Sequence, residues 1–301
     1  MEQEDKRQWT GRTDGTPLMH RWLQASLRVL PLWMVYVPMA TLVVPGYMLF
    51  AHKGYIAQYR FARKRLHHNP LRAFWNVYCN HCRFGQIIID RFYFYAGGKF
   101  KFDISNYDLY KKLSAASEGF VVLSSHVGNY ELAGYELKAK GKMLYALVFS
   151  GEGKEIMNNR NRLLVPNNIR LIPIADDMSH LFQLSNALAD NNIVSIHGDR
   201  VFGSPRAIKC RFFDSDAPFP LGPFTLATQR DVPVISVSVM KTGIKRYHII
   251  IHGFDVDHSV KRVSERAANL AKDYAAHLEE IVRQYPTQWF NFYDFWQDSD
   301  K

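Results

Sequence analysis

The chain of 301 residues contains only three cysteines, Cys79, Cys82 and Cys210. Three cysteines cannot build a disulfide framework, so the sequence suits a reducing compartment. Cys79 and Cys82 flank the motif CNHC around His81, but no second pair of ligands follows at a spacing that suits zinc. We therefore predict no metal site.

Acidic residues are missing from the whole segment between Asp14 and Asp90. The same segment carries nine of the 38 Lys and Arg residues, which leaves 29 bases against 28 acids in the rest of the chain. The formal net charge of +10 therefore belongs to this one segment. A concentrated basic segment can bind nucleic acid or anionic lipid.

The basic segment also contains an uncharged run of 23 residues, from Val29 to Ala51. A helix of this length measures about 34 Å, enough to cross a hydrocarbon core of about 30 Å. Its three prolines would kink a helix, but membranes tolerate proline. The late start and the lack of a small-residue cleavage site disfavour a signal peptide. We predict a membrane-embedded helix, with a buried core helix as the alternative.

The bases and aromatics that follow the run, in KGYIAQYRFARKRLHHNPLRAFW, favour anionic lipid headgroups over nucleic acid because they adjoin an apolar span. The positive-inside rule then places the chain behind them on the cytoplasmic side. We divide the chain into a polar, loose N-terminus at 1–18, a membrane anchor with basic amphipathic helices at 19–96, and a larger domain at 97–301.

Beyond residue 97, apolar runs alternate with amphipathic stretches, which is typical of an α/β fold. We expect a mixed, mostly parallel sheet with helices on both faces, joined by right-handed crossovers. Residues 206–214 alternate and are expected to form an edge ribbon. The expected strands are 119–125, 143–149, 169–174, 192–197, 232–240 and 246–252, and the expected helices lie near 130–140, 152–164, 178–190 and 261–284.

The stretch VVLSSHVGNYELAG places His126 at the end of an expected strand and Glu131 five positions later. Ligands of open α/β sheets bind at the carboxyl ends of strands. Asn129 can cap the next helix, and Glu131 falls in its first turn. A carboxylate folded back over the turn would orient the imidazole and leave its other nitrogen as a base. The alternative is a polar strand end beside a helix start.

The same His-x4-acid spacing recurs at His252 and Asp257, where no helix follows immediately, and we interpret that pair as structural. The chain has no G-x-S-x-G elbow, P-loop or G-x-G-x-x-G motif, which disfavours such serine hydrolases and nucleotide chemistry. A histidine base without its own nucleophile suits activation of a substrate hydroxyl or amine, for example for attack on an acyl thioester.

The block SSHVGNYELAG resembles the His-x4-Asp/Glu block of the lysophospholipid acyltransferase superfamily, particularly its bacterial lipid A late acyltransferase branch. VSIHGDRVFG, FPLGPFTLATQRDVPVISV and the terminal YPTQWFNFYDFW are similar to later segments of that branch, in the same order. Tyr130 stands where the branch often has tryptophan, and the basic pair near its C-terminal end is missing. These departures leave the acceptor open between lipid A, an aminolipid and another glycolipid.

The resemblance implies a glycerolipid acyltransferase-like fold at the bacterial inner membrane, with the catalytic domain facing the cytoplasm. The donor would be acyl-ACP or acyl-CoA as co-substrate, with no bound cofactor, and the acceptor a hydroxyl or amine of a lipid or glycolipid. His126 would be the general base, oriented by Glu131. A non-catalytic membrane-anchored lipid-binding protein and a thioesterase or lipase are the alternatives. Substrate binding would fall to Asn129, Asp199, Arg200, Gly222 and Pro223.

Overall fold

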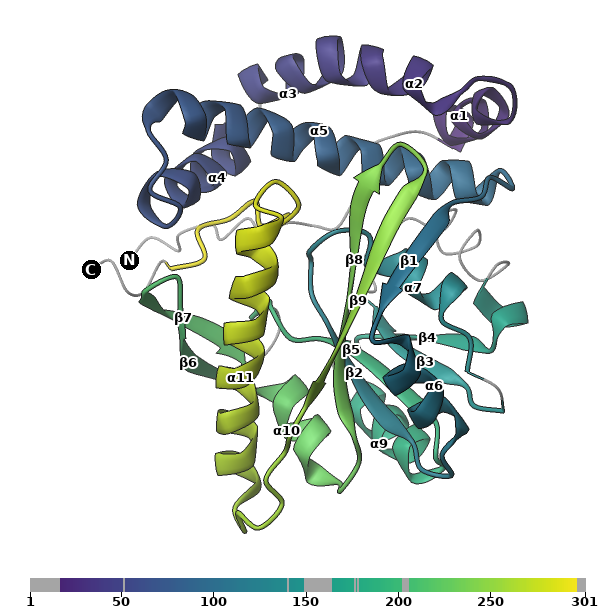
Figure 1. Cartoon of the computed structure of the whole chain (residues 1–301), viewed down its shortest axis with the longest axis vertical. Helices are drawn as coiled ribbons and strands as arrows, with labels where there is room; N and C mark the ends of the chain where they lie inside the picture. Colours follow the sequence, from purple (N-terminus) through teal and green to yellow (C-terminus); the bar gives the residue numbers. More distant parts are fainter. Residues whose placement is uncertain are drawn as a thin grey trace.

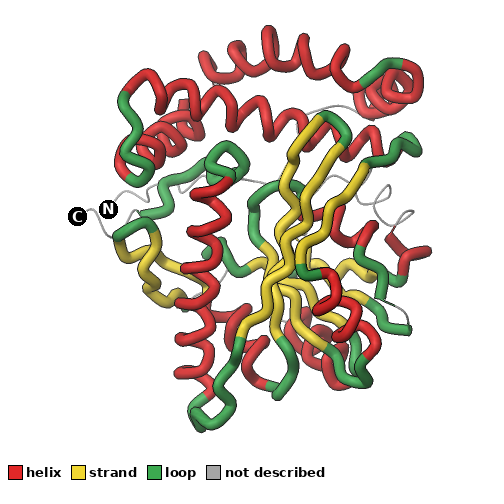
Figure 2. The backbone as a smooth tube through the Cα atoms, viewed as in Figure 1, coloured by secondary structure: helices red, strands yellow, loops and turns green. Residues whose placement is uncertain are grey.

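The computed structural model of the chain describes residues 17–50, 52–139, 141–148, 164–175, 177, 179–201 and 206–296. The predicted loose N-terminus at 1–18 and the predicted helix at 152–164 lie almost entirely outside these residues. The described part consists of a central sheet, helices on its two faces, and a layer of helices across one end of the sheet (Figures 1 and 2).

The central sheet has seven strands in the order β1-β9-β8-β2-β5-β3-β4. Only β8 and β9 pair antiparallel, and all other neighbours in this sheet are parallel. The predicted mixed, mostly parallel sheet is therefore confirmed. The strands are β1 (Lys101–Ser105), β2 (Phe120–Ser124), β3 (Leu144–Val148), β4 (Ile169–Pro173), β5 (Ile193–His197), β8 (Val234–Gly243) and β9 (Arg246–Phe254).

Helices cover both faces of the sheet, as the alternating pattern predicts. Residues of β2 alternate between two hydrophobic clusters, with Val121 and Leu123 in one and Phe120 and Val122 in the other. This period of two buries the strand on both sides. The covering helices are α6 (Tyr107–Ala115), α7 (Tyr130–Glu136), α9 (Ser179–Ala189), α10 (Leu221–Gln229) and α11 (Val263–Gln284), and a short η2 (Val165–Asn167) precedes β4.

The predicted ribbon at 206–214 does not join an edge of the main sheet. Its strand β6 (Ala207–Phe212) pairs only with β7 (Ser215–Pro220), as a separate antiparallel hairpin. Phe213 and Asp214 have φ values of 48° and 61°, so the tight turn is made by two residues in the left-handed region. The expectation of an edge ribbon was wrong because this turn folds the strand back onto its successor.

The helical layer comprises α1 (Pro17–Val29), α2 (Leu32–Pro38), η1 (Met39–Val43), α3 (Val44–Phe50), α4 (His52–Lys64) and α5 (Pro70–Tyr95). The helical path continues beyond Pro38 as the π-helical segment η1, in which the Val44 N–H donates to the Met39 carbonyl. Leu32–Phe50 is long and apolar enough to cross a membrane by length and composition, and 22% of it is buried. This stretch lies along α5 (Figure 1).

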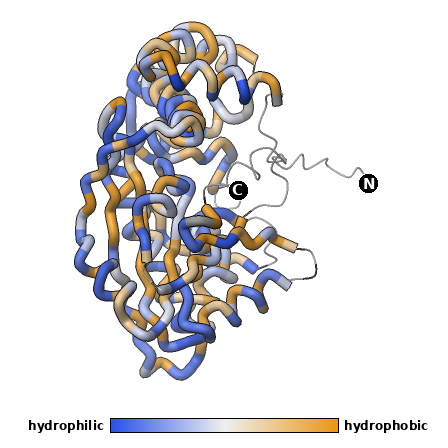
Figure 3. Tube along the Cα trace, turned by 90° about the vertical axis from the view of Figure 1, so that its right-hand side faces the viewer, coloured by the Kyte–Doolittle hydropathy of each residue, from blue (hydrophilic) through white to orange (hydrophobic). Residues whose placement is uncertain are grey.

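The layer shares its packing with the rest of the molecule. In Figure 3, hydrophobic residues lie both in the central strands and in the helical layer at the top of the view. Phe61 of α4 is 4% exposed, and its ring centre lies 4.8 Å from that of Trp289, near the end of the chain. Phe61 therefore belongs to the main hydrophobic core, while α1, α2, α3 and α5 form a hydrophobic cluster of their own.

Candidate functional site

The ends of two neighbouring parallel strands bring His126 and Asp199 together. Ser124 at the end of β2 pairs in register with His197 at the end of β5. His126 and Asp199 each follow their strand end by two residues, and Nδ1 of His126 lies 2.8 Å from Oδ1 of Asp199. The backbone N–H of His126 donates to Oδ2 of the same carboxylate at 2.7 Å. The carboxylate therefore holds both the ring and the main chain of His126.

The pair consists of a buried carboxylate and a partly accessible imidazole. The side chain of Asp199 is 1% exposed and that of His126 is 23% exposed. Burial would raise the pKa of Asp199, but His126, Arg200 and His197 together hold it well below its usual value. Asp199 is thus ionised and accepts from Nδ1–H. Among the residues that the structure describes, none bonds to Nε2 of His126.

Burial also lowers the pKa of His126, and the charge of Arg200 lowers it further, while Asp199 opposes both. The imidazole is therefore neutral at pH 7 and can take a proton at Nε2. Aromatic rings border it: the ring centre of His197 lies 4.5 Å away and that of Tyr130 lies 5.9 Å away. The prediction that His126 ends a buried strand agrees with this geometry.

Glu131 is directed elsewhere, and the expected bond from Glu131 to the imidazole is not the one that holds His126. The Glu131 carboxylate pairs with Nε of Arg91 at 2.9 Å and accepts from the hydroxyls of Tyr95 at 2.5 Å and Tyr135 at 3.0 Å. Arg91 and Tyr95 belong to α5, so this carboxylate ties α7 to the helical layer. The His-x4-acid spacing could not reveal that Asp199, from a neighbouring strand, already occupies Nδ1.

Asn129 holds the turn after His126, but not as the predicted helix cap. Its side chain makes no capping bond and instead donates to the hydroxyl of Tyr247 at 3.3 Å. Its backbone N–H donates to Val239 of β8 at 2.7 Å. Gly128 before it has a φ of +62°, and an added Cβ would lie 2.1 Å from the Val239 oxygen. Only glycine fits this close approach.

Residues 287–291, which we call the strap, bind the same turn from the other side. Phe290 donates its N–H to the carbonyl of His126 at 3.0 Å, and Gly128 donates to Gln288 at 2.8 Å. Two buried amides of the helical layer hold the strap: Gln58 donates to the Trp289 carbonyl at 3.2 Å, and Asn80 donates to it at 2.9 Å. Sequence reasoning missed these residues because single buried amides leave no pattern.

Asp199 and Arg200 were both predicted to bind substrate; Asp199 is instead bonded to His126, and Arg200, whose part in substrate binding stays a prediction, bonds to the strap. Its Nη2 donates to the carbonyl of Phe290 at 2.7 Å, and its guanidinium lies 5.9 Å from the ring centre of Tyr293. Tyr293 also lines a groove of about 440 Å³ between α4 and the end of the chain. Basic and aromatic side chains share this groove, among them Arg60, Lys64, Arg65, Phe295 and Trp296.

Gly222 and Pro223 lie in the first turn of α10, where Gly222 is exposed and Pro223 is buried. A Cβ added at Gly222 would meet no atom within 4 Å. Their part in substrate binding stays a prediction.

The second His-x4-acid pair is split. His252 stacks on His277 at 4.1 Å between ring centres, while Asp257 accepts from Ser259 at 2.6 Å. Within the described ranges, no group of three or more His, Cys, Asp or Glu side chains is arranged to hold a metal ion. His126 and Asp199 form the hydrogen-bonded acid–base pair of the site.

Comparisons with known proteins identify relatives of the chain. The family model of bacterial lipid A biosynthesis acyltransferases matches residues 98–298. No curated protein matches the chain. Among solved structures, the chain is similar to the 1-acyl-sn-glycerophosphate (LPA) acyltransferase PlsC from Thermotoga maritima, at 11% identity and a TM-score of 0.41, over 90% of this chain and 99% of that chain.

Proposed function

The chain belongs to the bacterial lipid A biosynthesis acyltransferase family, and from this premise we propose that it moves a fatty acyl chain from an acyl thioester to a lipid. The donor is acyl-ACP or acyl-CoA, and the acceptor is a hydroxyl or amine of a lipid or glycolipid. One observation carries the proposal: Nδ1 of a neutral His126 is bonded to an ionised Asp199, and no described residue bonds to Nε2.

The reaction needs one base and no acyl-enzyme. Nε2 of His126 takes the proton of the acceptor hydroxyl or amine while the acceptor atom attacks the thioester carbonyl carbon. The tetrahedral intermediate collapses, the carbon–sulfur bond breaks, and the imidazolium returns the proton to the departing thiolate. Asp199 stabilises the imidazolium between these steps. In this scheme Glu131 takes no part in proton transfer and acts indirectly, by holding α7 against α5.

The surface of the helical layer supports membrane association. Large apolar side chains project from its outer side, including Trp22, Trp33, Leu42, Val43, Leu49 and Phe50, which are 56% to 86% exposed. An apolar surface of this kind marks a membrane or protein contact. The bases of α4 and the start of α5 would meet anionic headgroups. We propose the bacterial inner membrane as the site, with the catalytic domain on the cytoplasmic side.

The groove beside Tyr293 supports an anionic substrate. Arg60, Lys64 and Arg65 line it, and the described lining residues include one carboxylate, that of Asp294, which pairs with Arg60 at 3.2 Å. The phosphate of a phosphopantetheine arm or of a lipid headgroup suits such a groove. Since Tyr293 also contacts Arg200, the groove adjoins the proposed catalytic pair.

One assay tests the proposed function. Membranes that contain the wild type or His126→Ala are incubated with labelled acyl-ACP or acyl-CoA, and the extracted lipids are resolved. A new acyl-lipid that the variant does not form supports the transferase. Release of free fatty acid by the wild type alone would instead favour a thioesterase or lipase. Identical lipid profiles would favour a lipid-binding protein. Mass spectrometry of lipids from a deletion strain then identifies the acceptor.

A further inference from the structure

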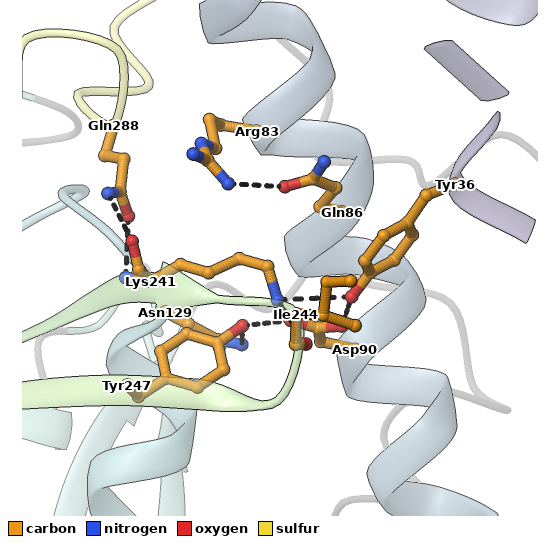
Figure 4. Close-up of polar contacts among 9 residues, drawn as sticks. All are labelled: Tyr36, Arg83, Gln86, Asp90, Asn129, Lys241, Ile244, Tyr247 and Gln288. Atoms are coloured by element: carbon orange, nitrogen blue, oxygen red, sulfur yellow. Dashed lines mark hydrogen bonds and ion pairs between the residues drawn. The ribbon is translucent and has the colours of Figure 1, made fainter. Parts of the chain in front are cut away.

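A buried charged cluster lies between the helical layer and the sheet, away from the reacting atoms. Asp90 of α5 and Lys241 of β8 form an ion pair at 2.5 Å, and their side chains are 0% and 1% exposed. The hydroxyls of Tyr36, from α2, and Tyr247, from β9, both donate to the Asp90 carboxylate. We call these four residues the junction cluster (Figure 4).

The junction cluster reaches the catalytic turn by two routes. The hydroxyl of Tyr247 accepts the side-chain N–H of Asn129 at 3.3 Å. The main chain of Lys241 exchanges two hydrogen bonds with the Gln288 side chain, at 2.8 and 2.9 Å, and the Gln288 carbonyl accepts from Gly128 at 2.8 Å. Both routes end within three residues of His126, one at Asn129 and the other at Gly128.

Stability alone is a poor reason for such a cluster. Removing two charges from water costs about as much as their attraction returns, and a well-packed apolar pair is often as stable. What a hydrogen-bonded ion pair adds is geometry, because it accepts only one arrangement of its partners. Here the partners come from α2, α5 and the β8–β9 hairpin. Burial raises the pKa of Asp90, and Lys241 with the two tyrosines opposes that rise.

We propose that Asp90 and Lys241 are positioning residues for His126, and that Tyr36 makes this positioning depend on the seating of α2 against α5. The inference rests on the proposed role of His126 as the general base. Tyr36 is 6% exposed, and its hydroxyl bonds to both members of the ion pair from α2. The apolar helix that we assign to the membrane is thereby connected to the base.

The gentlest test removes one hydroxyl. Tyr36→Phe in the full chain, in mixed micelles of anionic lipid, should lower kcat about ten- to a hundredfold, since small displacements of a catalytic group cost that much. The KM for the acyl thioester should stay near the wild-type value, and the melting temperature should fall only by the loss of one hydrogen bond to a charged group. Tyr47→Phe is the matched control, because Tyr47 of α3 is 52% exposed and its hydroxyl has no hydrogen bond among the described residues.

A second variant separates positioning from folding. Asp90→Leu combined with Lys241→Met replaces the ion pair by an apolar pair but removes the acceptor of the Tyr36 and Tyr247 hydroxyls, so unfolding by urea is measured alongside kcat. A folded double variant with lost kcat supports the proposal, whereas wild-type kcat in the folded double variant and in Tyr36→Phe overturns it. If the double variant does not fold, Tyr36→Phe decides the question by itself.

A readout independent of acyl transfer keeps the two proposals apart. Diethyl pyrocarbonate modifies neutral imidazoles, and peptide mass spectrometry gives its rate at His126 as a function of pH. A released turn should expose the ring and speed this modification in Tyr36→Phe, but not in Tyr47→Phe. Equal rates in wild type and Tyr36→Phe overturn the positioning role. If the wild type transfers no acyl chain, the proposed function is wrong. The modification rates at His126 would still test whether Tyr36 positions this residue.

Discussion

Replacing Asp199 by asparagine should abolish the base while leaving the site in place. The carboxylate accepts twice, from the backbone N–H of His126 at 2.7 Å and from its Nδ1 at 2.8 Å. An amide has only one acceptor oxygen, and the backbone N–H must keep it because that donor cannot change. The amide NH₂ then faces Nδ1, which favours the tautomer with hydrogen on Nε2. An Nε2 that carries hydrogen cannot take a proton.

The expected loss follows from that change of tautomer. General-base catalysis raises the rate about 10²- to 10⁴-fold. In Ser-His-Asp triads, an Asp→Asn change that leaves the histidine in the wrong tautomer lowers kcat by about the upper value. We expect kcat of Asp199→Asn to fall by this range, which corresponds to about 2.7 to 5.4 kcal/mol of transition-state stabilisation. The KM for the acyl donor should change little, because Asp199 lies beneath the imidazole with 1% of its side chain exposed.

The companion variant is Glu131→Gln, since both residues are acids near the same turn. Glu131 pairs with Arg91 and accepts from Tyr95 and Tyr135, so its loss should cost stability, about 1.5 to 3 kcal/mol for hydrogen bonds to a charged group. The kcat of the folded fraction should fall much less than in Asp199→Asn. Initial rates with labelled acyl thioester and urea unfolding of both variants measure the two effects.

The result that would refute this reasoning is a reversal of the two variants. If Glu131→Gln loses kcat by 10²-fold or more at unchanged unfolding free energy, and Asp199→Asn stays active, then Glu131 is the carboxylate that serves the imidazole in the working enzyme. That outcome would restore the pairing expected from the His-x4-acid spacing.

Three further predictions follow from charge and exposure. Activity should rise with pH as the imidazole of His126 loses its proton, at a pKa below the usual 6.5. Arg200→Gln should move this rise to higher pH, because the charge of Arg200 lowers the pKa of His126. A pH profile of kcat/KM measures the shift, and a rise at the same pH in the variant would contradict the prediction. Burial and, to a smaller extent, the charge of His252 lower the pKa of His277 from 6.5 to about 4. Between pH 4 and pH 6.5 the unfolded chain therefore binds more protons than the folded chain. The stability present above pH 6.5 is lost as the pH falls toward 4. This loss is on the order of 3 kcal/mol, and urea unfolding of His277→Gln should show a flatter pH dependence. Leu42→Glu, at a side chain that is 72% exposed, should weaken flotation with anionic vesicles, by up to about 3 kcal/mol, without changing unfolding; equal flotation would count against the membrane surface.

Local patterns in the sequence predict the strands and the place of His126, because burial on both faces gives β2 and β5 nearly continuous apolar runs. They do not predict which strands are neighbours. In the chain, β3 and β4 separate β2 from β5, yet the sheet order places β5 directly beside β2. Because Ser124 pairs in register with His197, His126 and Asp199, which lie two residues beyond these strand ends, face each other. An acid two residues beyond a neighbouring strand end was the signal for Asp199, and reading it requires the strand order.

The direction of Glu131 could not be predicted for a related reason. Its spacing from His126 is compatible with a bond over the turn, and only the position of α5 decides otherwise, by offering Arg91 and Tyr95. The β1 strand was missed as well, because Lys101–Ser105 is a short edge strand whose charged side chains alternate with partly buried ones. Its partner is β9, from a segment more than a hundred residues later in the chain.

The helical layer supports the turn of His126 as well as carrying the proposed membrane surface. The family match begins at residue 98, but buried side chains that support the catalytic turn come from before it. Gln58 and Asn80 hold the strap whose Phe290 bonds to His126, and Asp90 bonds to Lys241 and Tyr247, which in turn bond to Gln288 and Asn129. Each of these polar groups is buried and bonded, so its removal would leave an unsatisfied partner next to the turn. A chain without its first 96 residues would therefore keep His126 and Asp199 but lose the groups that fix where they stand.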